Sequence, residues 1–146
     1  MSDFLVDTNI LVYAYDRSEM IKKVKARDVL DWLESHGAGV LSTQVLGEFF
    51  NSVTRKLAQT LSPAEAYRSV QRYLSTWQVV PVSPAIVLEA TRGSVAHAMS
   101  YWDAQIWATA KLNQIPRVLS EDFSHGCRVE SVEFVNPFIV DISPEG

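Results

Sequence analysis

The sequence contains a single cysteine, Cys127, which excludes an internal disulfide. No cluster of cysteine and histidine offers a zinc site, so a reducing compartment suits this chain. The first residues, Met1-Ser2-Asp3-Phe4, lack the basic region of a signal peptide, and no apolar run approaches the roughly 18 residues of a membrane-spanning helix. These absences predict a cytoplasmic protein that does not enter a membrane.

Positive charge is also scarce. The 13 lysine and arginine residues are outnumbered by 17 aspartate and glutamate residues, which gives a formal net charge of −4. Such a chain repels a polyanion unless basic residues cluster or cations intervene, so a function on nucleic acid would have to involve bound metal. The 47% of apolar and 21% of charged residues are ordinary for a folded protein. We expect one domain over 1–146, because this length buries a sizeable core.

Short apolar runs alternate with stretches of helical periodicity along the whole chain. Strands are expected at 4–6, 40–42, 77–82, 118–119 and 132–135. Helices are expected from about residue 10, over 21–36 and 45–57, from 63, and over 84–99 and 101–112. This alternation predicts an α/β fold with a parallel sheet covered on both faces, and ligands of such sheets bind beyond the carboxyl ends of the strands.

Four acidic residues are expected near that edge. Asp7 follows the first strand and Asp122 comes shortly after the strand at 118–119. Glu48 lies in the second turn of its helix and Asp103 in the first turn of its own. Each position also has an ordinary interpretation: Asp7 and Asp103 as helix caps, Glu48 as a solvated helix residue and Asp122 as a turn residue. Taken together, their placement indicates one acidic site.

Carboxylates that are gathered in one place repel each other unless a cation compensates them. Mg²⁺ and Mn²⁺ prefer oxygen ligands, and one or two such ions can promote the displacement of an oxygen at phosphorus. The three histidines, His36, His97 and His125, have no obvious nucleophile partner. The residues therefore favour metal-dependent hydrolysis of phosphodiesters.

Four short motifs in order along the chain resemble those of the PIN-domain family, and within it the VapC-type toxins of toxin–antitoxin pairs. They are Val6-Asp7-Thr8-Asn9-Ile10-Leu11, Gly47-Glu48-Phe49, Ser100-Tyr101-Trp102-Asp103-Ala104 and Leu119-Ser120-Glu121-Asp122-Phe123, with the continuation Ser124-His125-Gly126. One departure is visible at the end of the Asp103 helix, where the family often has glycine and this chain has Asn113-Gln114. Asparagine tolerates the left-handed conformation, so we expect it there.

The resemblance implies a three-layer α/β/α sandwich with a mainly parallel, five-stranded sheet. It implies that Asp7, Glu48, Asp103 and Asp122 bind Mg²⁺ or Mn²⁺ and catalyse cleavage of single-stranded or looped RNA, leaving a 3′-hydroxyl and a 5′-phosphate. Three supporting residues would steady the carboxylates or a bound water: Thr8, Asn9 and Ser120. The implied partners are the RNA, a cognate antitoxin protein and a second copy of the chain in a homodimer.

Other functions remain to be weighed against a toxin nuclease. Asn9 stands where an aspartate-nucleophile phosphatase has a second aspartate, and a phosphoacceptor domain would need an aspartate near Val82-Ser83 and a lysine near Asn136-Pro137. A dinucleotide site needs glycines after the first strand, which Asp7-Thr8-Asn9-Ile10 lacks. A solitary PIN-type nuclease, a non-catalytic module that binds RNA or an antitoxin, and DNA as the substrate all stay open.

Several further side chains invite a contact with RNA. A basic cluster follows the first helix, comprising Arg17, Lys22, Lys23, Lys25 and Arg27, although a solvated helix face is the more ordinary interpretation. Trp107 is expected in the core and His125 in solvent. Trp102 adjoins the acidic site, and the sequence leaves open whether it packs or contacts substrate.

Overall fold

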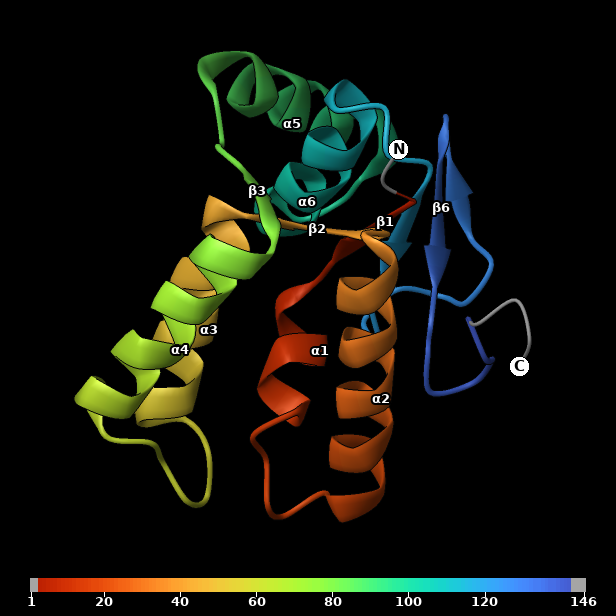
Figure 1. The fold of residues 1–146 in the computed structure, drawn as a ribbon. Helices are drawn as coiled ribbons and strands as arrows, with labels where there is room; N and C mark the ends of the chain where they lie inside the picture. The colour runs from red at the N-terminus through yellow and green to blue at the C-terminus, as the bar shows by residue number, and fades with distance from the viewer. Residues whose placement is uncertain (1–2, 143–146) are drawn as a thin grey trace.

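A sheet of six strands forms the centre of the computed structural model, which describes residues 3–142 (Figure 1). The strands are β1 Phe4–Val6, β2 Gly39–Ser42, β3 Gln78–Val80, β4 Arg117–Leu119, β5 Arg128–Val129 and β6 Val132–Val135. Their spatial order is β3-β2-β1-β4-β6-β5, and all neighbours are parallel except β5 and β6. β1 is therefore central: Leu5 pairs with Val40 of β2 on one side and with Val118 of β4 on the other.

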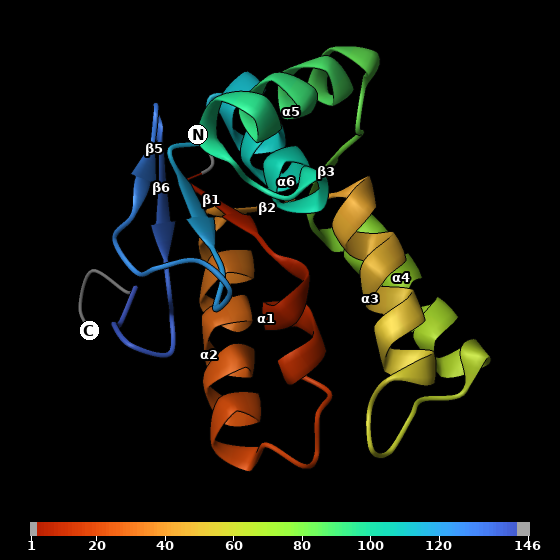
Figure 2. The same cartoon turned by 180° about the vertical axis from the view of Figure 1, so that it is seen from behind.

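Helices cover both faces of this sheet, as the two opposite views show (Figures 1 and 2). On one side lie α1 Thr8–Tyr13, α2 Met20–His36, α3 Thr43–Arg55 and α4 Pro63–Thr76, and on the other lie α5 Pro84–His97 and α6 Tyr101–Leu112. The expected three-layer α/β/α sandwich with a mainly parallel sheet is thus confirmed. Within residues 3–142, no helix combines the length and the hydrophobicity needed to cross a membrane.

The expected number of five strands was wrong by one. β5, a two-residue strand, pairs with β6 in antiparallel register through Val129 and Val132. The turn between them places Glu130 in the left-handed region, at φ 52°. A glutamate at such a position gives no turn signal in the sequence, because glycine and asparagine are the residues that usually occupy it.

Side-chain caps fix the points at which the strands turn into helices. Asp7 caps α1 by accepting a hydrogen bond from the Thr8 backbone N–H, and Ser42 caps α3 in the same way through Val45. Since β1 and β2 are parallel neighbours, both caps lie at the carboxyl edge of the sheet. The first turns of α1 and α3 are therefore held side by side at this edge.

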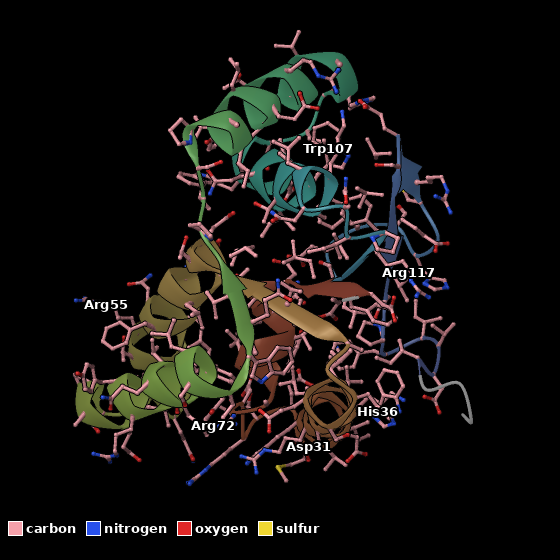
Figure 3. All side chains as sticks on the ribbon, turned by 45° about the horizontal axis from the view of Figure 1, so that its top comes forward. Asp31, His36, Arg55, Arg72, Trp107 and Arg117 are labelled. Atoms are coloured by element: carbon pink, nitrogen blue, oxygen red, sulfur yellow. The ribbon has the colours of Figure 1, made fainter. Side chains whose placement is uncertain are left out.

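The core between the sheet and the α5–α6 layer is built around Trp107. Its side chain is fully buried, as expected from the sequence, and its indole N–H donates to the Val129 carbonyl at 3.1 Å (Figure 3). Gly93 of α5 makes this possible, because a Cβ added there would lie 2.3 Å from Cζ3 of Trp107. The absence of a side chain at Gly93 thus lets α5 pack closely on α6.

The end of α6 differs in detail from the expectation. Asn113 ends the helix without turning left-handed, at φ −96°, and Gln114 takes the left-handed conformation, at φ 58°. The Gln114 N–H donates to the Lys111 carbonyl and the Ile115 N–H to the Ala110 carbonyl, which is the Schellman pattern. The expectation that Asn113 adopts the left-handed conformation was therefore wrong by one residue.

Candidate active site

Asp7 is the most deeply placed of the four acids, with 7% of its surface exposed. One carboxylate oxygen accepts the Thr8 backbone N–H at 2.7 Å, and the other accepts the Ser120 hydroxyl, also at 2.7 Å. Asn9 contacts the second oxygen at 3.5 Å through its side-chain amide. The capping role considered for Asp7 is thus observed, but it occupies only one of the two oxygens.

Ser120 connects the loop after β4 to the loop after β1. Its hydroxyl donates to Asp7 and accepts both the Asn9 amide, at 3.3 Å, and the Asp122 backbone N–H, at 3.1 Å. The carbonyl oxygen of the Asn9 side chain in turn accepts the Glu121 backbone N–H at 3.3 Å. These bonds fix the position of Asp122 relative to Asp7, although the Asp122 side chain itself is exposed.

A cavity of about 370 Å³ opens beside these residues and brings in a third acid. Its lining includes Thr8, Asn9 and Asp122 from the carboxyl edge, together with Glu48, Ser52 and Lys56 from α3. Residues four apart share one face of a helix, so the spacing 48, 52, 56 aligns all three along the cavity. The sequence analysis did not assign Lys56 to the site, although this spacing from Glu48 was visible.

Burial and mutual repulsion both act on the Asp7 carboxyl. Burial raises the pKa of Asp7 to about 6; the hydrogen bonds from Ser120 and Thr8 oppose this rise, and the charges of Asp122 and Glu48 add to it. The chemistry of the site follows from this balance: Asp7 holds a proton more readily than an exposed aspartate, and a nearby cation would favour its ionised form.

Glu48 and Asp103 form the other half of the acidic group. Glu48 is exposed at the edge of the cavity, yet the protein around it removes part of its hydration and raises its pKa, and the Asp103 carboxylate raises it further. A hydrogen bond from Gln44 and the charge of Lys56 act in the opposite direction. Asp103 is half-buried in the first turn of α6, where its backbone N–H donates to the Ser100 hydroxyl. The expected cap at Ser100 is thus observed.

Electrostatic repulsion therefore links the four acids: the charges of Asp122 and Glu48 raise the pKa of Asp7, and the charge of Asp103 raises the pKa of Glu48. Two further acids, Asp16 and Glu121, line the cavity with Glu48 and Asp122, and Glu121 has an ionic partner on α2. Burial alone would raise the pKa of Glu121, yet hydrogen bonds from Lys22 and Tyr13 hold it below its usual value. Glu121 is thus paired with a cation, whereas Asp7, Glu48, Asp103 and Asp122 form no ion pair within residues 3–142.

The oxygen-only donor set fits a hard divalent cation. Among residues 3–142, no three acidic, histidine or cysteine side chains are arranged so that they already surround one ion. Mg²⁺, however, commonly takes only one or two protein carboxylates and keeps water in its other positions. The Thr8 hydroxyl, at the cavity wall, is one of two buried side-chain oxygens that lack a hydrogen-bond partner in the described part of the chain. The site therefore has polar atoms to spare for an ion and its water.

The remaining candidates for contact with RNA lie on the surface or are engaged elsewhere in the fold. The basic cluster is dispersed: Lys22 pairs with Glu121, Arg27 donates to the Ala14 carbonyl and Arg17 donates to Gln59. His125 is exposed, as expected, and accepts the Asn136 backbone N–H. Trp102 is 63% exposed and lies outside the core.

A sequence model of the PIN domain matches residues 4–125, and the chain belongs to the PIN-domain family. Members of this family are nucleases. No curated relative matches the chain in sequence. The resemblance drawn from the four motifs is thereby confirmed.

Solved structures with a similar fold include toxins and toxin–antitoxin complexes. VapC20 of Mycobacterium tuberculosis, a toxin that cleaves the sarcin–ricin loop, is 18% identical, with a TM-score of 0.67 over 82% of this chain and 90% of that chain. A chain of the DNA-bound VapBC of Salmonella typhimurium is 16% identical, with a TM-score of 0.67 over 92% and 97%. A chain of DNA-bound FitAB is 19% identical, with a TM-score of 0.69 over 94% and 97%. At these identities the likeness concerns the fold.

Proposed function

We propose that this chain is an endoribonuclease that depends on Mg²⁺ or Mn²⁺ and acts as the toxin of a toxin–antitoxin pair. The observation that carries the proposal is the group of carboxylates at the carboxyl edge of the sheet, which repel one another and raise, together with burial, the pKa of Asp7 to about 6. Burying acids against one another is costly, and a site that binds a cation is the usual reason for it. PIN-domain nucleases generally use divalent metal ions, which agrees with this reasoning.

In this proposal Asp7, Glu48, Asp103 and Asp122 hold the metal. A bound divalent ion would neutralise the carboxylates, lower the pKa of attacking water and stabilise the charge that develops on the phosphate oxygens. Ser120 and Asn9 orient the Asp7 carboxylate, which must keep one geometry for the ion to be held. In the hydrolysis, the oxygen of water bonds to phosphorus and the bond from phosphorus to the 3′ oxygen breaks. The products are a 3′-hydroxyl and a 5′-phosphate.

The positive charge that RNA requires comes from two sources in this account. The ion supplies it at the cleaved phosphate, and Lys56 supplies it at the far end of the cavity. Lys22 is beside the same cavity, but Glu121 already pairs with it. This arrangement reconciles a net charge of −4 with a polyanionic substrate.

Two protein partners are supported, one by the similar solved structures and one by the apolar surface of α5. Structures similar to this chain include toxin–antitoxin complexes from Klebsiella pneumoniae and Salmonella typhimurium, which supports an antitoxin as partner here. Val87, Leu88 and Val95 of α5 are exposed apolar side chains, which supports a second copy as a further partner. Sedimentation of the purified chain should show a dimer; a monomer at micromolar concentration would contradict that part of the proposal.

The proposal is tested by incubating the protein with end-labelled RNA and DNA of the same sequence, both single-stranded and hairpin. Mn²⁺, Mg²⁺ or a chelator is added in parallel reactions. We expect cleavage of RNA only, in the presence of metal only, with fragments that carry a 5′-phosphate. Cleavage of DNA at the same rate would mean that the protein is a nuclease that does not distinguish RNA from DNA. Binding of RNA with no cleavage in any metal would favour the non-catalytic module, which also suits the lack of a preformed three-ligand group among residues 3–142.

A further inference from the structure

A second cavity, of about 480 Å³, lies next to the acidic one. It is formed by the first turns of α3, by Val82 after β3 and by the first turn of α6 with Trp102 and Gln105. Glu48 lines both cavities, so the second cavity adjoins the proposed cleavage site directly. Its volume is within the range of small-molecule sites.

An aromatic side chain forms one wall of this cavity. Trp102 is 63% exposed, and Tyr101 contacts its ring edge to face at 5.0 Å between centroids. Among residues 3–142, the other tryptophans are more enclosed: Trp107 and Trp77 are buried and Trp32 is half-buried against His36. A large exposed indole beside a catalytic cavity has the properties of a stacking platform.

A glycine keeps the cavity open. Gly47 lines it from α3, and a Cβ added at Gly47 would meet no other atom within 4 Å. Glycine inside a helix weakens it relative to alanine, and no close approach or positive φ explains its presence at this position. The space that a side chain would fill is instead left to the cavity.

A polar group in the wall lacks a partner. The amide of Gln44 donates to the Trp102 carbonyl at 3.3 Å, while its oxygen is buried and accepts no hydrogen bond within the described part of the chain. Rotation of the Gln44 side chain toward the cavity that it lines would let this oxygen accept an N–H from a flat heterocycle that enters beside Trp102. An indole face, an open floor and an unpaired acceptor together match a nucleobase.

We propose that this cavity is a nucleobase subsite: a base adjacent to the cleaved phosphodiester stacks on Trp102 above Gly47 and donates a hydrogen bond to Gln44. The inference rests on the proposed function, since it names the part of the RNA that this site reads. Stacking tolerates any base, and each RNA base carries an amino or imino N–H that the Gln44 oxygen can accept, so the subsite binds a base through its ring face and one edge.

The test measures binding separately from cleavage. A short fluorescein-labelled single-stranded RNA is titrated with protein in Ca²⁺, a cation that also prefers oxygen ligands, and fluorescence anisotropy gives the dissociation constant; a gel of each sample checks that the RNA stays uncut. The variants are Trp102→Ala, Trp102→Phe and Gly47→Leu, and the control is Tyr67→Ala, which truncates an aromatic side chain of α4 that is 61% exposed, close to the exposure of Trp102. Melting temperatures are recorded for each; Gly47→Leu should melt no lower than the wild type, because leucine favours a helix.

We expect Trp102→Ala to weaken binding about tenfold or more, and Trp102→Phe to retain most of the affinity, because loss of base–aromatic stacking has effects of this size. Gly47→Leu should weaken binding similarly by filling the cavity, and Tyr67→Ala should bind as the wild type does. Equal affinity of Trp102→Ala, Gly47→Leu and the wild type would overturn the subsite while leaving the nuclease intact. The subsite would also be overturned if Trp102→Ala and Gly47→Leu left RNA binding unchanged and reduced only self-association in sedimentation, since the cavity would then contact a second copy of the chain. A wild type that neither binds nor cleaves RNA would overturn the proposed function, and the subsite with it.

Discussion

Replacing Asp7 by asparagine should stabilise the metal-free protein while abolishing its activity. A carboxyl whose pKa is about 6 in the folded protein, instead of 3.8, makes its ionised form unfavourable by about 3 kcal/mol. Asparagine keeps the shape and can still accept the Thr8 N–H, but it carries no charge. Because the Ser120 hydroxyl must turn to suit the new amide, we expect a net gain of about 1–3 kcal/mol in the free energy of unfolding at pH 7.5.

The stability that Asp7→Asn gains over the wild type should increase with pH and never decrease. Well below the ordinary pKa of 3.8, the Asp7 carboxyl is protonated in both the folded and the unfolded protein, so wild type and variant should differ only by the cost of the rearranged hydrogen bond at Ser120. As pH rises through about 4 to 6 the unfolded chain ionises first, and the wild type loses stability relative to Asp7→Asn. Above about pH 7 both states are ionised, and the difference should stay constant.

Urea unfolding of both proteins in chelator, at several pH values from 4 to 8, measures this difference. Exposed Asp28 of α2 provides the matched control, because Asp28→Asn should change stability by less than about 0.5 kcal/mol at every pH. Saturating Mn²⁺ should then stabilise the wild type and not Asp7→Asn, since an ion that binds only the folded state adds to its stability. A wild type as stable as Asp7→Asn at pH 7.5 in chelator would refute the reasoning about the buried acid.

Three further changes test the packing and the site. Gly93→Ala should destabilise the protein by about 1–3 kcal/mol in urea unfolding, because its Cβ would lie 2.3 Å from the ring of Trp107; unchanged stability would show that α5 and α6 separate freely. Gly47→Ala, which meets no neighbour, should instead stabilise α3 by about 0.5–1 kcal/mol, and a loss would contradict the open space described for it. Ser120→Ala removes a hydrogen bond that lowers the pKa of Asp7, so the acidic limb of the cleavage rate against pH should move to higher pH; a limb that stays in place would remove Ser120 from its supporting role.

Much of the fold was readable because the sequence signals were local. β1 and β4 are short apolar runs that end at polar residues, and this pattern was sufficient to place Asp7 and Asp122 at one edge. Their proximity then follows from parallel pairing, in which Val6 lies beside Leu119. The same logic predicted the start of α6, whose Ser100 cap is visible in the sequence.

What the sequence did not predict depends on long-range contacts. β5 was missed because its turn has Glu130 at positive φ. Ion pairs to Arg92 and Lys111 and a hydrogen bond with His97 hold that residue in place. These partners come from α5 and α6, which are distant from Glu130 in the chain, so no local sequence pattern predicts the turn. Gln114 in place of Asn113 at the end of α6 is a smaller case, since the Schellman geometry rather than intrinsic preference selects the left-handed residue.

The candidate site was predicted in its acids but not in its surroundings. Glu48 alone suggested a solvated helix residue, and only the packing of α3 beside α1 shows it facing the same cavity as Asp122. Lys56 joins the cavity through the same helix face, two turns further along α3. The exposure of Trp102 could not be read from its neighbours, because α6 is buried on all sides over residues 104–110 while residue 102 remains in solvent.

The most direct test of the central claim compares RNA cleavage by the wild type and by Asp103→Asn, purified side by side, over a range of Mn²⁺ concentrations. Asp103 is suited to this role because it is half-buried at the start of α6, so the isosteric change should leave the fold intact. We predict cleavage by the wild type that rises with Mn²⁺ and disappears in chelator, and none by a folded Asp103→Asn. Equal cleavage by both preparations would mean that the activity belongs to a contaminant, and it would contradict the assignment of this acidic site as a nuclease centre.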